Sequence, residues 1–152
     1  MQRLSKEVKL LIAGYWRPPG LRESFIRLSK KKGVEEQVKV LGPVSEHRLR
    51  TLYSNARALV YPTEISMCMP ALEAAAHGCS VVVPGGTPPF SHGVHGFFPS
   101  IENIDEFSEY VGRLAYDERL AWKMGYEAWK VARRYTWEYH TRQLLQVIMK
   151  YT

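Results

Sequence analysis

The chain has 152 residues, 45% of them apolar and 24% charged, and its 21 basic and 15 acidic side chains give a net charge of +6. This composition is that of a folded globule and excludes disordered and fibrous proteins. No apolar run approaches the roughly 20 residues of a membrane-spanning helix, the start lacks a signal-peptide cleavage site, and two cysteines are too few for a disulfide framework. We therefore expect one domain, residues 1–152, in the cytoplasm.

Four short β-branched runs without polar alternation indicate strands buried on both faces of a parallel sheet. Each run ends at a glycine or proline, and they cover residues 8–13, 37–41, 57–61 and 80–83. Helical patterns lie between them at 21–32, at 45–55 with Ser45 as N-cap, and at 70–77, where Pro70 suits the first helical position. This alternation predicts an α/β fold with a doubly wound, Rossmann-like parallel sheet and helices on both faces.

From residue 103 onward the pattern is wholly helical and predicts a helical C-terminal tail. The expected helices are 103–115, 117–134 with Asp117 as N-cap, and 137–150 capped by Thr136.

Four aromatic residues recur along this tail at spacings near one or two helical turns, namely Trp122, Tyr126, Trp129 and Tyr135. We expect them to pack in the core rather than to stack on a base or sugar. The basic residues are expected on solvated helix faces, where they attract nucleotides or an anionic membrane surface. Nucleic acid is not an expected partner, because no RNP, zinc-finger or KH pattern accompanies the charge.

The most specific pattern is YPTEISMCMPALEAAAHGCS, residues 61–80, followed by VVVPGGTPPFSHGVHGFF. It resembles the nucleotide-binding C-terminal half of GT-B glycosyltransferases, most closely the retaining glycosyltransferase family four. That family has a helix Leu-Glu-Ala-Met-Ala followed by Gly-x-Pro-Val-Val and then Gly-Gly-x-Pro-Glu. The segments VKVLGPV, LYSNA and RYTWE extend the resemblance from Val8 to the C-terminus.

The resemblance implies that Glu73 binds the ribose of a nucleoside diphosphate sugar. We expect Glu73 in the first helical turn, where the positive end of the macrodipole favours a carboxylate by about 0.3–1 kcal/mol. Backbone amides from Met67 to Ala71 would meet the diphosphate or the sugar. Met69, Pro70, Ala71 and Leu72 are also expected to bind substrate. Gly42, Pro43 and Val44 would border the base, and Gly86, Thr87 and Pro88 would line the sugar and phosphate side. No metal or other cofactor is implied.

The donor loop departs from the family pattern. The family has a sugar-binding glutamate eight residues before the helix glutamate, whereas Ile65 stands there in this chain and Glu64 lies one residue earlier. Either a shortened loop delivers Glu64 to the same place, as a catalytic residue, or that function is lost. Cys68 replaces a loop glycine, and Pro89 stands where the family has the glutamate of Gly-Gly-x-Pro-Glu.

The segment before Val8 resembles neither the family's first strand nor its glycine loop and Arg…Lys pair. That strand would lie centrally in the sheet, so strands 8–13 and 57–61 would lose their shared neighbour. We therefore expect a fragment that transfers no sugar alone and whose partner is an N-terminal acceptor-binding domain.

The leading function is that of the donor-binding domain of a retaining glycosyltransferase. The alternatives are a non-catalytic nucleotide-sugar-binding module and a structural partner chain. His92 and His95 are too few for a metal site, and His77 is expected to cap its helix. Cys68 lacks an identifiable base, and Arg17 is a secondary nucleotide-facing candidate. The charge adds an expected contact with the inner membrane surface.

Overall fold

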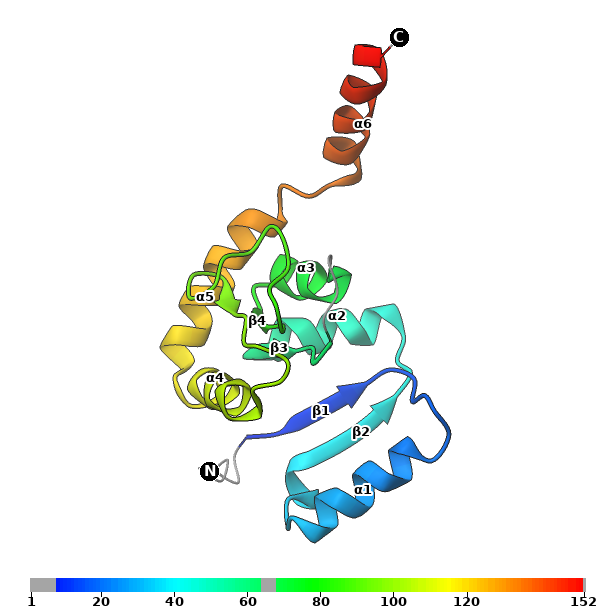
Figure 1. Cartoon of the computed structure of the whole chain (residues 1–152), viewed down its shortest axis with the longest axis vertical. Coiled ribbons are helices and arrows are strands. Elements are labelled where there is room, and N and C mark those ends of the chain that lie inside the picture. Colours follow the sequence, from blue (N-terminus) through cyan, green and yellow to red (C-terminus); the bar gives the residue numbers. More distant parts are fainter. Residues whose placement is uncertain (1–7, 64–67, 152) are drawn as a thin grey trace. The chain divides into compact units, whose positions relative to one another are not determined.

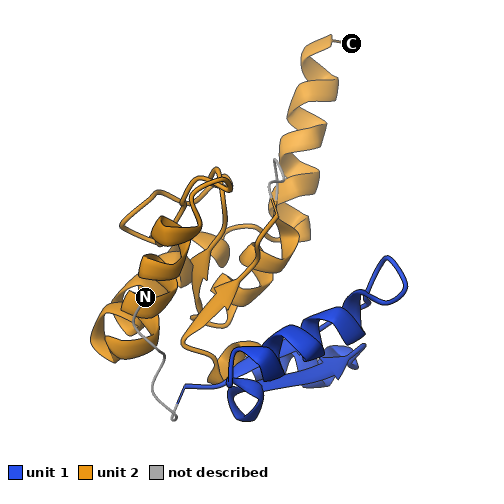
Figure 2. Cartoon of the chain, turned by 60° about the horizontal axis from the view of Figure 1, so that its bottom comes forward, with its two compact units in different colours: residues 1–52 blue, residues 53–152 orange. Residues whose placement is uncertain are grey.

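The computed structural model describes residues 8–63 and 68–151 and divides the chain into two compact units, residues 1–52 and 53–152 (Figure 2). A single domain of residues 1–152 stays a prediction. Figure 1 shows strands alternating with helices and a helical C-terminal part. In chain order the elements are β1 (Leu10–Ala13), α1 (Leu21–Lys31), a 3₁₀ turn (Glu35–Gln37), β2 (Val38–Gly42), α2 (Glu46–Asn55), β3 (Ala58–Val60), α3 (Met69–Ala76), β4 (Ser80–Val82), β5 (Gly96–Phe97), α4 (Ile104–Tyr116), α5 (Glu118–Ala132) and α6 (Trp137–Tyr151).

The strands pair in parallel, which confirms the predicted α/β, Rossmann-like class. They form two sheets in the described residues, β1-β2 and β3-β4-β5, rather than one. The expectation that the chain lacks a central strand stays a prediction.

The first unit contains the β1-β2 sheet, which is extended at its C-terminal end by a hydrogen bond of 2.9 Å from the Gly14 amide to the Gly42 carbonyl. Leu10 and Leu11 of β1 are 40% and 47% exposed. The prediction that this strand is buried on both faces is therefore wrong. Successive side chains point to opposite faces of a strand, and neither face of this small sheet is fully covered.

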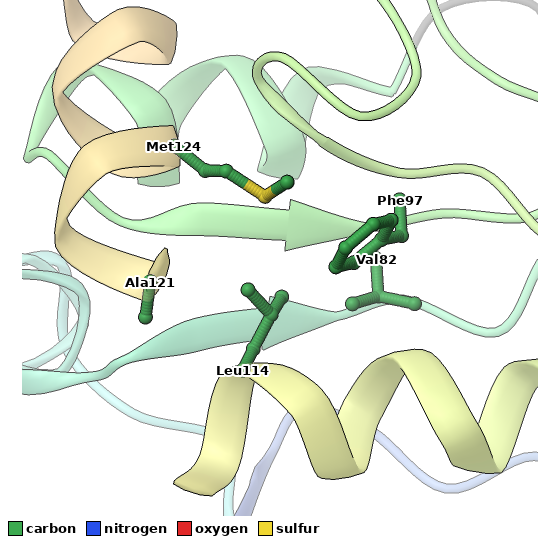
Figure 3. Close-up of a cluster of buried hydrophobic side chains, with 5 residues drawn as sticks. All are labelled: Val82, Phe97, Leu114, Ala121 and Met124. Carbon is green, nitrogen blue, oxygen red and sulfur yellow. The ribbon is translucent and has the colours of Figure 1, made fainter. Parts of the chain in front are cut away.

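In the second unit, β4 is the central strand and contacts α3, α4 and α5. Val81, Val82 and Val83 follow one another and are all fully buried, so both faces of this sheet are covered. Figure 3 shows the core cluster on one side, formed by Val82, Phe97, Leu114, Ala121 and Met124.

Strand β5 was not predicted, because it is only two residues long and one of them is a glycine. Gly96 allows its pairing, since a Cβ there would lie 2.0 Å from the carbonyl oxygen of Val81.

The predicted N-caps are confirmed. The side-chain oxygens of Ser45, Asp117 and Thr136 accept backbone amides at 3.3, 2.8 and 3.1 Å from Arg48, Leu120 and Tyr139, respectively. None of the helices in the described part of the chain is long and apolar enough to cross a bilayer.

The predicted burial of the tail aromatics is wrong for three of the four residues, since only Trp129 is partly buried. Trp122 is 68% exposed, and Tyr126 and Tyr135 are 45% and 46% exposed. Helix α5 instead buries small residues and a methionine, namely Ala121, Met124, Gly125, Ala128 and Ala132. The helix backbone lies so close to the turn at Gly78 that a Cβ on Gly125 would lie 2.0 Å from the Gly78 carbonyl oxygen. Large rings do not fit at such a contact, so they occupy the outer face.

Candidate functional site

Helix α3 carries Glu73, the main candidate for ligand binding. The helix begins at Met69, with Cys68 as N-cap and Pro70 in the first turn, and ends at Ala76. Glu73 is its fifth residue and lies in the second turn, so the predicted first-turn position is wrong and the macrodipole argument does not apply. Its side chain is exposed and accessible to a ligand.

Two neighbours restrain Glu73. The buried Tyr53 hydroxyl donates a long hydrogen bond of 3.5 Å to the Glu73 carboxylate. Burial, together with the negative charge of Glu73 and this hydrogen bond, raises the pKa of Tyr53 to about 12. One turn further along α3, Nδ1–H of His77 donates to the Glu73 backbone carbonyl at 2.9 Å, which confirms His77 as the helix cap. Both the side chain and the backbone of Glu73 are thus held in place.

Sequence analysis missed Tyr53 as a site residue. The residue lies 20 positions before Glu73, near the end of α2, and no spacing rule joins the two. The available signal is the segment LYSNA, which contains Tyr53 and belongs to the resemblance to the family.

Thr87 ties the loop after β4 to the start of α3. Its buried hydroxyl accepts a hydrogen bond of 2.9 Å from the Cys68 amide. The structure therefore brings Thr87 and the first turn of α3 together, as predicted for one site. The Thr87 side chain is engaged within the protein, so its arrangement favours positioning of the loop over direct contact with a ligand.

The amides at the start of α3 are less available than predicted. The Cys68 amide is bound to Thr87, the Ala71 amide donates to the Cys68 carbonyl at 3.0 Å, and Pro70 has no N–H. Met67 lies outside the described residues. Of the residues in this stretch that the structure describes, Met69 alone keeps an amide without a partner.

The cysteines do not have the properties of nucleophiles. Burial raises the pKa of the Cys68 thiol and raises that of Cys79 to about 12. A nucleophilic cysteine needs the thiolate form. Cys68 therefore lacks thiolate character, in addition to the general base that the sequence does not identify.

The other predicted site residues are distributed as follows. Glu64, the candidate catalytic residue, lies outside the described residues, as does Ile65. Gly42, Pro43, Val44 and Arg17 belong to the first unit, and Pro70, Leu72, Gly86 and Pro88 belong to the second, where they are at least partly exposed. The Ala71 side chain is fully buried, which leaves its backbone for any ligand contact.

The two loop histidines have structural roles. Nδ1 of His92 accepts the Phe98 amide at 3.1 Å, and Nδ1 of His95 accepts the Ser91 amide at 2.8 Å. Within the ranges that the structure describes, no three His, Cys, Asp or Glu side chains gather in a way that could hold a metal ion.

Because the pKa of Tyr53 is raised, the stability of the protein changes with pH in the alkaline range. The ordinary pKa is 10.0 and the native value about 12, so the unfolded chain releases this proton first. The free energy of unfolding therefore falls as the pH rises from about 10 to 12. We expect Tyr53→Phe to reduce this fall, measured by urea unfolding at pH 9 and pH 11. Tyr151→Phe, at a residue that is 82% exposed, is the control; an equal pH dependence in both variants would contradict the assignment.

The hydrogen bond of Thr87 predicts a loss of stability on its removal. Thr87→Val keeps the shape of the side chain but leaves the buried Cys68 amide without an acceptor, which costs about 1–3 kcal/mol. Urea unfolding measures the difference. Thr87→Ser keeps the hydroxyl and should recover most of the loss; if serine and valine destabilise equally, the hydroxyl is not the cause.

The chain matches a known protein family in sequence and several solved proteins in structure. The sequence model of the family described as glycosyl transferases group 1 matches residues 1–117. Sucrose-phosphate synthase from Thermosynechococcus elongatus is similar in structure, with a TM-score of 0.80 and 19% identity over 93% of this chain and 38% of that chain. Anabaena HepE in complex with UDP-glucose gives a TM-score of 0.81 and 16% identity over 95% of this chain and 41% of that chain.

A third similar structure is the C-terminal domain of a glycosyl transferase group 1 family protein, LpcC, from Francisella tularensis. Its TM-score is 0.75, with 18% identity over 84% of this chain and 69% of that chain. At these identities the likeness shows a shared fold. The chain spans about two fifths of the length of the first two proteins. No curated protein matches the sequence.

Proposed function

Because the chain belongs to the family of group 1 glycosyl transferases, we propose that it binds the nucleoside diphosphate sugar donor of a retaining glycosyltransferase. The observation that carries the proposal is the exposed Glu73 on α3, restrained by Tyr53 within the segment that matches the family. HepE, which shares the fold, was solved with UDP-glucose. A uridine nucleotide is therefore the first donor to test.

Each part of the site has a distinct role in this proposal. The Glu73 carboxylate accepts hydrogen bonds from the ribose hydroxyls, for which its two oxygens are suited. Residues 86–88 and the Met69 amide border the sugar and diphosphate, and Glu64 holds a sugar hydroxyl. Stabilising the charge on the departing diphosphate is the main electrostatic task of such a site.

The acceptor is held by a further domain in this proposal. Support comes from the length of the chain, which spans about two fifths of sucrose-phosphate synthase and HepE. The 152 residues alone are therefore expected to bind a donor without transferring its sugar. Turnover of a nucleotide sugar by these residues alone would contradict this part of the proposal.

We also propose that the protein works in the cytoplasm, at the inner membrane surface. The support is its net charge of +6, because anionic lipids attract basic proteins.

Titration calorimetry with UDP, GDP and ADP tests donor binding. We expect UDP to bind best of the three, and UDP-glucose to compete with UDP for the same site. A chain that binds none of the nucleoside diphosphates would be a structural partner and not a donor-binding domain. The role of Glu64 is tested separately by Glu64→Gln. This change should weaken the binding of UDP-glucose more than the binding of UDP, because Glu64 is assigned to the sugar.

A further inference from the structure

Helix α5 (Figure 1) carries aromatic and basic side chains that are exposed or partly buried. Its aromatic members are Trp122, Tyr126 and Trp129, and its basic members are Arg119, Lys123, Lys130 and Arg133. These positions recur at intervals of three and four residues, so they lie along one side of the helix. We call this set the aromatic-basic face.

The acidic residues of α5 neutralise only part of the charge of this face. Glu118 pairs with Arg57 at 3.2 Å and Glu127 pairs with Lys130 at 2.5 Å. Arg119 and Lys123 have no acidic partner among the described residues. The face therefore keeps a positive charge that is complementary to an anionic surface.

The arrangement of the rings points to the kind of partner. Trp122 and Tyr126 are stacked with centroids 5.6 Å apart and planes 5° apart, and Trp129 continues the row at 5.8 Å and 22°. Lys130 lies over Tyr126 at 5.3 Å, and Arg133 lies over Trp129 at 4.9 Å.

Most ring faces are thus covered by one another or by cations. Stacking on nucleic-acid bases needs free ring faces, and this row offers few. Tryptophan and tyrosine also lie at the boundary between lipid and water, with their apolar rings toward the lipid and basic side chains beside them. Trp122, at 68% exposed, extends furthest into solvent.

We propose that the aromatic-basic face of α5 docks on an anionic bilayer surface. This inference rests on the membrane contact proposed above and names its surface, but it does not depend on donor binding. Trp122 and Tyr126 enter the headgroup region, while Arg119 and Lys123 lie among the anionic headgroups. The helix lies along the surface and does not cross the bilayer.

Sedimentation with vesicles tests the proposal on the whole chain. We expect binding to phosphatidylcholine vesicles that contain phosphatidylglycerol, weaker binding at high salt, and little binding to phosphatidylcholine alone. Arg119→Gln combined with Lys123→Gln should weaken binding about thirtyfold, because each basic residue near an anionic surface contributes a factor of about five. Lys31→Gln combined with Lys32→Gln changes the net charge equally, at exposed positions at the C-terminal end of α1, and should have a much smaller effect.

Ring insertion has its own readout. Vesicles with brominated lipids should quench tryptophan fluorescence in the wild type and much less in Trp122→Phe, whereas Trp137→Phe on α6 should leave most of the quenching. Three results would overturn the proposal: no binding to anionic vesicles, equal losses in the α5 and α1 charge variants, or stronger binding of polyuridylate than of vesicles. UDP titration of the same α5 variants should be unchanged, so failure of the docking surface is distinguishable from failure of donor binding.

Discussion

Replacing Glu73 by Gln weakens UDP binding by roughly tenfold to a hundredfold, the range expected when hydrogen bonds to a charged group are lost. The carboxylate can accept from both ribose hydroxyls, whereas the amide offers one acceptor oxygen and turns a donor group toward the other hydroxyl. Titration calorimetry of wild type and variant measures the change. Because Glu73 is exposed, we expect the variant to fold normally, with little change in its free energy of unfolding.

The choice of glutamine makes this test specific. The glutamine oxygen can still accept the Tyr53 hydroxyl, so the local hydrogen bond is preserved while the charge is removed. Glu102→Gln removes one charge from an exposed position outside the site and serves as the control. If both variants weakened UDP binding equally, the effect of Glu73 would be one of general charge. If Glu73→Gln left UDP binding unchanged, Glu73 would not belong to the binding site.

Much of the fold could be predicted because local chemistry determines it. Ser45, Asp117 and Thr136 each have a side-chain oxygen that satisfies an amide three residues later, and such caps depend only on neighbouring residues. The run 80–83 has no polar residue after Ser80, and Val81 to Val83 are buried as expected for a strand covered on both faces.

The parts that could not be predicted depend on contacts between distant segments. Strand β5 exists because Gly96 fits against Val81, and its two residues carry no pattern of their own. The same limit applies to the site. Glu73 could be named from its motif, but its hydrogen bond to Tyr53 and the bond from Cys68 to Thr87 require the packed structure.

The aromatic residues of α5 lie on a helix, as their spacing predicts, but not on the side of the helix that packs in the core. Their helical spacing is real, and it was assigned to the core because large rings usually contribute the most buried area. The structure buries the adjacent side of the helix, where Ala121, Gly125 and Ala128 allow close approach of the backbone. A stripe of small residues at the same spacing was the signal that could have reversed the assignment.

Gly125 is the residue on which this close packing depends, and Gly125→Ala is expected to lower the free energy of unfolding by about 2–3 kcal/mol, as in other overpacked cores. A Cβ at this position would lie 2.0 Å from the carbonyl oxygen and 2.9 Å from the carbonyl carbon of Gly78. Both atoms belong to the backbone turn between α3 and β4, so no side-chain rotation can relieve the contact. Urea unfolding measures the loss.

The sign of this effect separates packing from helix propensity. Alanine is a better helix former than glycine by about 1 kcal/mol, so a glycine in a helix without a close neighbour should be stabilised by the same change. Gly112 in α4 is such a position, since a Cβ there meets nothing within 4 Å. We therefore expect Gly112→Ala to raise the free energy of unfolding and Gly125→Ala to lower it. If both variants were stabilised, α5 would not lie against the turn that ends α3, and the explanation for its exposed aromatic rings would fail with it.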